Sequence, residues 1–250
     1  MKRAIRVEAL KLTRSPVGIV AGLAIVLGLL ALLGGISAAV AGGQPELVVK
    51  LGPAASADWG GLLSAAAQIM SAGGLLGFGV VLSWMFGREF TDGTITALFA
   101  LPVGRGRIAL AKLVVFLCWA VAVAVASTLG LLALGLLLRY GAPGPDAWVA
   151  LGRQLALGAL TAVSAIPVAW VATATRSLLA GVASAIALVV LAQVGALAGA
   201  GGWMPPAAPA LWAISGGTAV SAGQLSLTVA VAALFAAVVA VSWSRLQLHR

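Results

Sequence analysis

Residues 17–41 have the sequence VGIVAGLAIVLGLLALLGGISAAVA, and no charged residue occurs between residues 17 and 45. An α-helix needs about 20 consecutive apolar residues to cross the ~30 Å hydrocarbon core of a bilayer. The stretch is also longer than the apolar part of a cleaved signal peptide, which has about 7–15 residues. We therefore expect it to remain in the mature protein as a first transmembrane helix.

The composition of the whole chain agrees with a membrane environment. Of its 250 residues, 62% are hydrophobic and only 8% are charged, whereas soluble domains carry about 25% charged residues. At about 20 residues a span, this length holds about six spans and no sizeable soluble domain. The sequence predicts an all-α integral membrane protein with a single transmembrane domain over residues 1–250.

Charged and Gly/Pro-rich segments divide the apolar sequence into six predicted spans, with a kink expected at Pro167, which cannot donate a helical hydrogen bond. The predicted spans are 17–41, 61–86, 113–138, 154–175, 178–200 and 224–243. Residues 201–223 are uncharged but contain prolines, glycines, Trp203 and Trp212. This composition favours a re-entrant or interfacial segment over a surface loop, which is usually more polar.

The distribution of basic residues predicts the orientation. Of the 15 Lys and Arg residues, only Lys50, Arg139 and Arg153 fall on one side of the predicted spans, and the other 12 fall on the opposite side. Short cytoplasmic loops carry the excess of Lys and Arg. We therefore expect a multi-pass protein of the cell membrane with both termini and residues 88–112 in the cytoplasm.

Several classes of function are disfavoured. Cys118 and His249 are the only residues of their kinds, so one chain forms neither a disulfide nor a His/Cys metal site. No Asp, Glu or His lies inside a predicted span, so the spans lack the side chains that a proton relay would need. The Gly-Arg-Gly-Arg run at 104–107 lacks P-loop spacing. The basic residues lie between apolar blocks without interleaved aromatics, which argues against nucleic-acid binding.

A few polar residues lie within the predicted spans. The candidates to line a substrate path are Gln68, Gln154, Thr161, Ser164 and Gln193. Hydrogen bonding between helices explains such residues more often than a transport pathway does. Both interpretations remain open for each of the five.

Residues 87–102, GREFTDGTITALFALP, form the most informative connection. Asp92 can cap a short helix in which Ile95, Leu98 and Phe99 share one face, and Pro102 would end it. A short amphipathic helix at the membrane surface is the expected result. Its apolar stripe needs a cover, either lipid headgroups or the groove of a protein partner.

This connection is similar to the one between the second and third helices of type-2 ABC exporter permeases, a six-helix class. The matching residues are Glu89, Gly93, Thr94, Leu98, Pro102, Arg105 and Lys112. The predicted six-span plan resembles that family over the whole chain. Residues 1–16, with Glu8, Lys11, Leu12, Arg14 and Ser15, also resemble the cytoplasmic lead-in helix of that family.

The resemblance implies that the segment is a coupling helix that docks into a groove of a separate ATPase. The implied coupling residues are Glu89, Phe90, Gly93, Thr94, Ile95, Leu98, Phe99 and Pro102. For Glu89, a local salt bridge with Arg88 or Arg105 is the alternative.

The resemblance further implies two ATPase copies that bind ATP and Mg²⁺, a second copy of this permease or a similar one, and no cofactor in this chain. The implied function is export of a hydrophobic drug, peptide, lipid or similar molecule, with membrane lipids as further contacts. An autonomous channel or secondary carrier, or a structural anchor subunit, is the alternative from another class.

Overall fold

The computed structural model describes residues 1–42, 56–95 and 103–246. Helices are the only regular secondary structure in these ranges. Six helical stretches are long and apolar enough to cross a membrane, which confirms the predicted all-α fold with six spans. They are Pro16–Ala41, Trp59–Thr91, Arg105–Leu137, Pro145–Ala174, Leu178–Leu197 and Ala222–Arg245.

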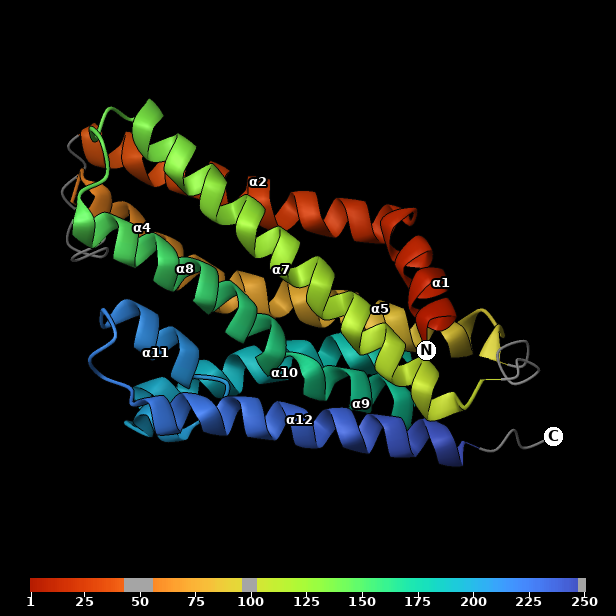
Figure 1. Ribbon diagram of the computed structural model, residues 1–250. Coiled ribbons are helices and arrows are strands. Elements are labelled where there is room, and N and C mark those ends of the chain that lie inside the picture. The colour runs from red at the N-terminus through yellow and green to blue at the C-terminus, as the bar shows by residue number, and fades with distance from the viewer. Residues whose placement is uncertain (43–55, 96–102, 247–250) are drawn as a thin grey trace.

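The spans run side by side as an elongated bundle with two distinct ends (Figure 1). At one end, here called the terminal end, lie helix α1 (Lys2–Thr13), the end of α5 (Leu75–Thr91), the start of α7 (Arg105–Leu137) and the end of α12 (Ala222–Arg245). The opposite end is called the far end. There the starts of α4 (Trp59–Ile69) and α8 (Pro145–Ser164) lie near the short helix α11 (Ala208–Ile214).

The second span is a composite of three helical pieces. A π-helical turn, η2 (Met70–Gly74), joins α4 to α5 without a break in the rod. Single π-turns inside α-helices mark places where the regular hydrogen-bond ladder is locally widened. Gly74 lies in this turn, where a Cβ would stand 2.8 Å from the sulfur of Met70.

The fourth span is also divided, into α8 and α9 (Ile166–Ala174), with Ala165 between them. Pro167 stands in the first turn of α9, where a missing N–H costs least. The helix that contains this predicted span begins at Pro145, whereas the span itself was predicted from residue 154. Pro145 suits the first turn of a helix, and Asp146 complements the positive end of the helix dipole, so this polar stretch is helical.

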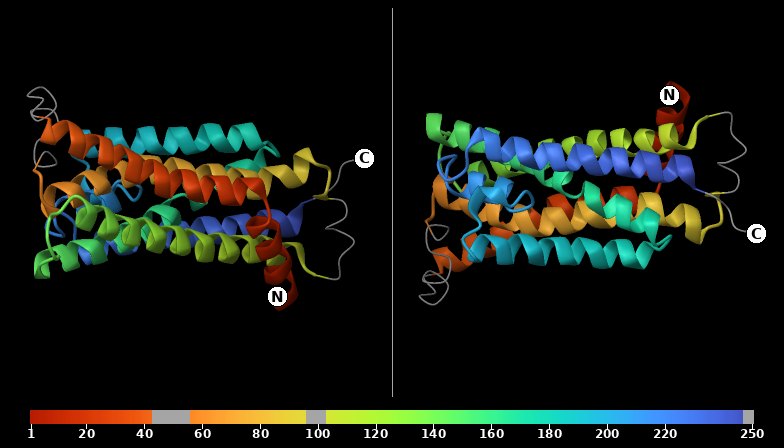
Figure 2. Two further views of the ribbon diagram at one scale, coloured as in Figure 1. Left: turned by 90° about the horizontal axis from the view of Figure 1, so that it is seen from above. Right: turned by 90° about the horizontal axis from the view of Figure 1, so that it is seen from below.

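The core lies between α5, α7, α8 and α9. Phe78 of α5 meets the rings of Phe116 and Trp119 of α7 edge to face, at centroid distances of 6.1 and 6.0 Å. Helix α10 (Leu178–Leu197) packs closely on α5, because a Cβ on Gly79 would lie 2.5 Å from the Cβ of Ala185. Most residues of helices α2 (Pro16–Ala41), α10 and α12 are not buried, and Figure 2 shows these helices along the outside of the bundle.

The predicted re-entrant segment 201–223 contains a 3-10 turn, η3 (Gly201–Trp203), and α11 at the far end of the bundle. Thr228 of α12 donates a hydrogen bond of 2.8 Å to the carbonyl of Pro205, which ties this segment to the last span. Ser221 and Gln224 form a reciprocal capping box that begins α12. Whether the segment enters the bilayer stays a prediction.

Candidate coupling site

Four charged side chains from three helices meet at the terminal end of the bundle. Glu8 and Lys11 project from α1, Glu89 from the last turns of α5, and Lys112 from α7. We call these four residues the ionic cluster. Their positions in the sequence are far apart, and the fold of α1 against α5 and α7 brings them together.

The geometry of the ionic cluster is a closed set of ion pairs. The Lys112 ammonium lies 2.7 Å from Oε1 of Glu89 and 2.8 Å from Oε2 of Glu8. The Lys11 ammonium lies 3.0 Å from Oε1 of Glu89 and 3.1 Å from Oε1 of Glu8. Thr94 donates a further hydrogen bond to Oε2 of Glu89. Two carboxylates and two ammonium groups leave the cluster neutral.

Burial makes these contacts energetically important. The side chains of Lys112 and Glu89 are each 1% exposed, whereas that of Lys11 is 33% exposed. Removing one partner from a buried ion pair costs about 3–5 kcal/mol, because the other charge loses its compensation. Burial disfavours the Lys11 ammonium, but the carboxylates of Glu8 and Glu89 outweigh this and raise the pKa of Lys11 above its ordinary value.

Trp243 near the end of α12 connects the ionic cluster to the last span. Its indole N–H donates to the hydroxyl of Thr173 at 3.1 Å, and its ring lies 5.9 Å from the Lys112 ammonium. Phe86 and Phe90 of α5 meet the same ring edge to face at 5.7 and 6.4 Å. The ends of α5, α7, α9 and α12 are therefore packed around one fully buried tryptophan.

Helix α5 ends directly beside the ionic cluster. Asp92 is its C-cap residue and lies 3.4 Å from Arg88, whose guanidinium stands 4.5 Å from the centre of the Trp84 ring. Gly93 follows with φ of +66°, a conformation that glycine adopts with little strain. The chain therefore turns sharply at Gly93 as it leaves the bundle.

The predicted coupling residues fall into three groups. Gly93 and Thr94 are exposed beyond the end of α5. Glu89 and Ile95 are buried and Phe90 is half-buried, so in this structure they contact the chain itself and not its surroundings. Leu98, Phe99 and Pro102 lie outside the described residues.

Glu89 forms salt bridges within the chain, as the alternative interpretation expected, and it is not exposed on a docking surface. Its partners are Lys11 and Lys112, however, and not Arg88 or Arg105 as the sequence suggested. Arg105 instead donates a hydrogen bond to the carbonyl of Leu246. In the sequence analysis, Lys11 and Lys112 indicated the orientation and the family resemblance, and neither was placed beside Glu89. One signal in the sequence could have indicated this cluster. Glu8 and Lys11 are spaced to pair on one helix face, and the chain has few other acidic residues.

The five candidate pathway residues fall into two groups in this protomer, and their role in transport stays a prediction. Gln154, Thr161 and Ser164 are buried along one face of α8, where the hydroxyl of Ser164 bonds the carbonyl of Leu160 at 2.9 Å. Gln68 and Gln193 are exposed on the outside of the protomer. The amide nitrogen of Gln154 is buried and has no hydrogen-bond partner among the described residues.

Comparison with known proteins agrees with this architecture. A family model described as ABC-2 family transporter protein matches residues 4–193, which include most of α1, the ionic cluster and the first five spans through most of α10. No curated protein and no solved structure is similar enough to this chain to match it.

Proposed function

Because this chain belongs to the ABC-2 family of transporter permeases, we propose that it is the membrane subunit of an exporter driven by a separate ATPase. Membership of the family and six apolar helices make it a multi-pass membrane permease. Export as the direction of transport, contact with a separate ATPase and the orientation in the membrane are parts of this proposal. The terminal end would face the cytoplasm and the far end would face outside.

The observation that carries the coupling proposal is the position of the ionic cluster. Glu89 stands seven residues before residue 96, where the undescribed segment 96–102 begins, and its carboxylate is paired with both α1 and α7. A force that displaces residues 93–102 pulls directly on the end of α5. Because the Glu89 carboxylate is held by two ammonium groups, that displacement either carries α1 and α7 with it or breaks the cluster.

The proposed mechanism follows from this connection. Two ATPase subunits would close on ATP and Mg²⁺, press on residues 89–102, and tilt the helices gathered at the terminal end. Tilting would alternately open a substrate cavity toward each side of the membrane. The apolar interior suits a hydrophobic drug, peptide, lipid or similar molecule better than a sugar.

We propose a second permease copy as a further partner. Helices α2, α10 and α12 present large apolar side chains outward, among them Leu27, Leu179 and Leu197. Lipid or another protomer can cover such faces. A dimer would enclose a pathway that six helices alone have little room for. Disulfide crosslinking of cysteines placed on these faces in native membranes should trap dimers, and monomers at every position would reject the dimer.

The coupling proposal is tested by Leu98→Asp with Thr96→Asp as the matched control. The sequence predicts that residue 98 belongs to the apolar stripe and residue 96 to the other face. A charge buried in a protein groove without a partner is strongly destabilising. We expect Leu98→Asp to insert normally but to lose copurification of the ATPase and transport, whereas Thr96→Asp keeps both. A Leu98→Asp protein that retains its ATPase and still transports would reject this coupling role.

A further inference from the structure

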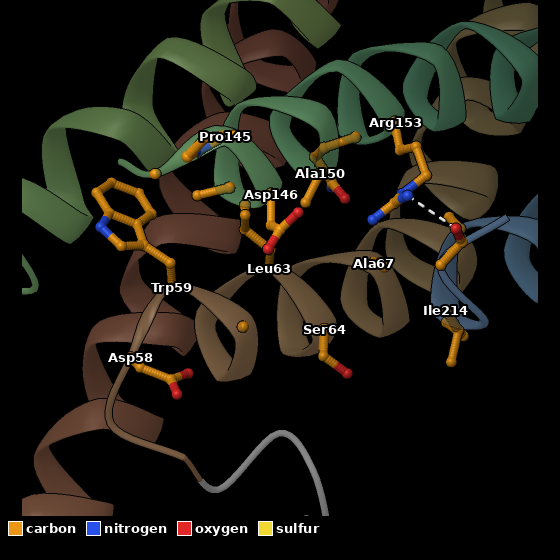
Figure 3. Close-up of a pocket in the computed structure, with 16 residues that line it drawn as sticks. Asp58, Trp59, Leu63, Ser64, Ala67, Pro145, Asp146, Ala150, Arg153 and Ile214 are labelled. Carbon is orange, nitrogen blue, oxygen red and sulfur yellow. Dashed lines mark hydrogen bonds between the residues drawn. The ribbon is translucent and has the colours of Figure 1, made fainter. Parts of the chain in front are cut away.

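A pocket of about 460 Å³ opens at the far end of the bundle, between the starts of α4 and α8 and the helix α11. Figure 3 shows its lining in close-up. Its walls come from the start of α4, the first three turns of α8, and the end of α11 with the loop after it. Sites for small organic ligands typically have about 300–1,000 Å³. The lining residues that the structure describes all belong to one protomer.

Small side chains at helical spacing create this pocket. Helix α4 contributes Leu63, Ser64 and Ala67 from one face, and α8 contributes Ala147 and Ala150 opposite them. Alanine and serine leave space between two helices that larger residues would fill. Ile214 of α11 adds an apolar wall on the open side. The middle of the pocket is therefore apolar.

Polar groups stand at both ends of this apolar middle. Asp146, in the first turn of α8, is exposed, and its carboxylate is paired with no described residue. Arg153 lies two turns further along the same face, and Figure 3 shows both side chains directed into the space between α8 and α4. Arg153 donates one hydrogen bond of 2.7 Å to the carbonyl of Gly216. A guanidinium has five N–H donors, so others remain for a ligand.

Gln154 is the observation that points to a ligand. Its side chain lines the pocket and is only 4% exposed, and its amide nitrogen has no hydrogen-bond partner among the described residues. An unpaired buried donor costs about 1–3 kcal/mol, which makes this amide a candidate to bind a group from outside the chain. An acceptor oxygen supplied by a ligand would satisfy it.

Asp58 plays a structural role at the mouth of the same pocket. Its carboxylate accepts hydrogen bonds from the backbone N–H of Gly61 and from the hydroxyl of Ser56, at 2.8 and 2.9 Å. The Gly61 N–H and the Ser56 hydroxyl together hold the pKa of Asp58 below its ordinary value. Asp58 therefore stays ionised and adds negative potential on the Asp146 side of the pocket.

We propose that this pocket binds a short zwitterionic peptide or a molecule of the same chemistry. Its ammonium group pairs with Asp146, its apolar body lies along Ala150 and Leu63, and its terminal oxygens accept from Gln154 and Arg153. Seven residues along α8 correspond to about 10 Å. Three extended residues span about the same distance, so a tripeptide matches the spacing. The inference is independent of the direction of transport and of the ATPase.

The test is direct binding of alanyl-leucyl-alanine to the purified permease in nanodiscs, followed by titration calorimetry. The amino-acetylated peptide should bind the unchanged protein about tenfold more weakly, because it lacks the charged end. In Asp146→Asn, the free and acetylated peptides should bind equally. Ala150→Phe, which fills the middle of the pocket without altering a polar group, should abolish binding.

Gln154→Leu separates a ligand role from a structural one. It should weaken peptide binding about fivefold, because one hydrogen bond is lost. It should also raise the melting temperature of the ligand-free protein, because an unpaired buried amide is removed. Gln193→Leu, on an exposed position of α10, is the control and should leave binding unchanged.

Two results would overturn the inference. One is no measurable binding of the tripeptide by the unchanged protein at millimolar concentration. The other is a Gln154→Leu protein that melts lower than the unchanged protein and binds the peptide as well, which would show that the amide serves the fold. Neither result bears on coupling to the ATPase, which the Leu98→Asp comparison addresses separately.

Discussion

Replacing Lys112 by methionine removes one of the two cations from the ionic cluster. Methionine keeps the length of the side chain, so the change is mainly one of charge. Glu8 and Glu89, with side chains 4% and 1% exposed, then share the single ammonium of Lys11. Removal of one partner from a buried pair costs about 3–5 kcal/mol. Because Lys11 remains within 3.1 Å of both carboxylates, we expect the low end, about 3 kcal/mol.

This loss should be visible as a fall in melting temperature. For a chain of this length, each kcal/mol shifts the melting temperature by about 2–4 °C, so Lys112→Met should melt about 6–12 °C lower. Size-exclusion chromatography of heated, fluorescently tagged protein gives the measurement. Arg107→Met is the matched control, because it removes an exposed basic residue from the same helix, and it should change the melting temperature little.

A double replacement checks that the cost arises from the cluster. Adding Glu89→Gln to Lys112→Met restores the balance of charge, with Glu8 and Lys11 remaining. The combined loss should then be smaller than the sum of the two single losses by about 1–2 kcal/mol, as expected for interacting residues. A Lys112→Met protein that melts within about 1 °C of the unchanged one, or strictly additive losses, would refute the reasoning.

Three further outcomes are expected. Gly79→Ala should destabilise by about 1–3 kcal/mol through overpacking against α10, whereas Gly34→Ala, with open space around it, should not; thermal melting measures both. Because the pKa of Lys11 is raised, the stabilisation that its ammonium gives is complete below pH 10.5 and is lost only as pH rises through the raised pKa. The rate at which limited proteolysis cleaves α1 should therefore increase only above pH 10.5. An increase near neutral pH would contradict this. In a cysteine-free background, an impermeant external reagent should label a cysteine at Ala142 but not one at Thr94; the reverse pattern would invert the orientation.

Much of the fold could be predicted because membrane spans have a strong local signal. Apolar runs of about 20 residues, bounded by charges or by Gly/Pro-rich segments, identify the spans without knowledge of their neighbours. The largest difference between a predicted span boundary and the end of the corresponding helix is at the start of the fourth span. Asp146 and Arg153 make residues 145–153 look like a loop, but they lie on a helix that reaches beyond the apolar stretch at the far end.

The candidate site was less predictable because its contacts depend on the tertiary structure. Glu89 pairs with residues 78 positions before it and 23 positions after it, and no sequence spacing reveals such partners. Uniformly apolar helices also give no sign of which face is buried. For this reason Gln154 proved to be buried while Gln193, chosen on the same grounds, is exposed.

The interruption at Ala165 gives the fourth span a joint. A continuous helix behaves as a single lever, so that a tilt at one end becomes an equal and opposite displacement at the other. Two rods joined at one residue can change their mutual angle through a few backbone torsions while each rod keeps its own hydrogen bonds. Thr173 on α9 is hydrogen-bonded to Trp243, whereas Gln154 lies on α8, so a change of angle at Ala165 would displace one of these residues relative to the other. Bending at Ala165 would therefore let the two ends of the fourth span move independently of each other.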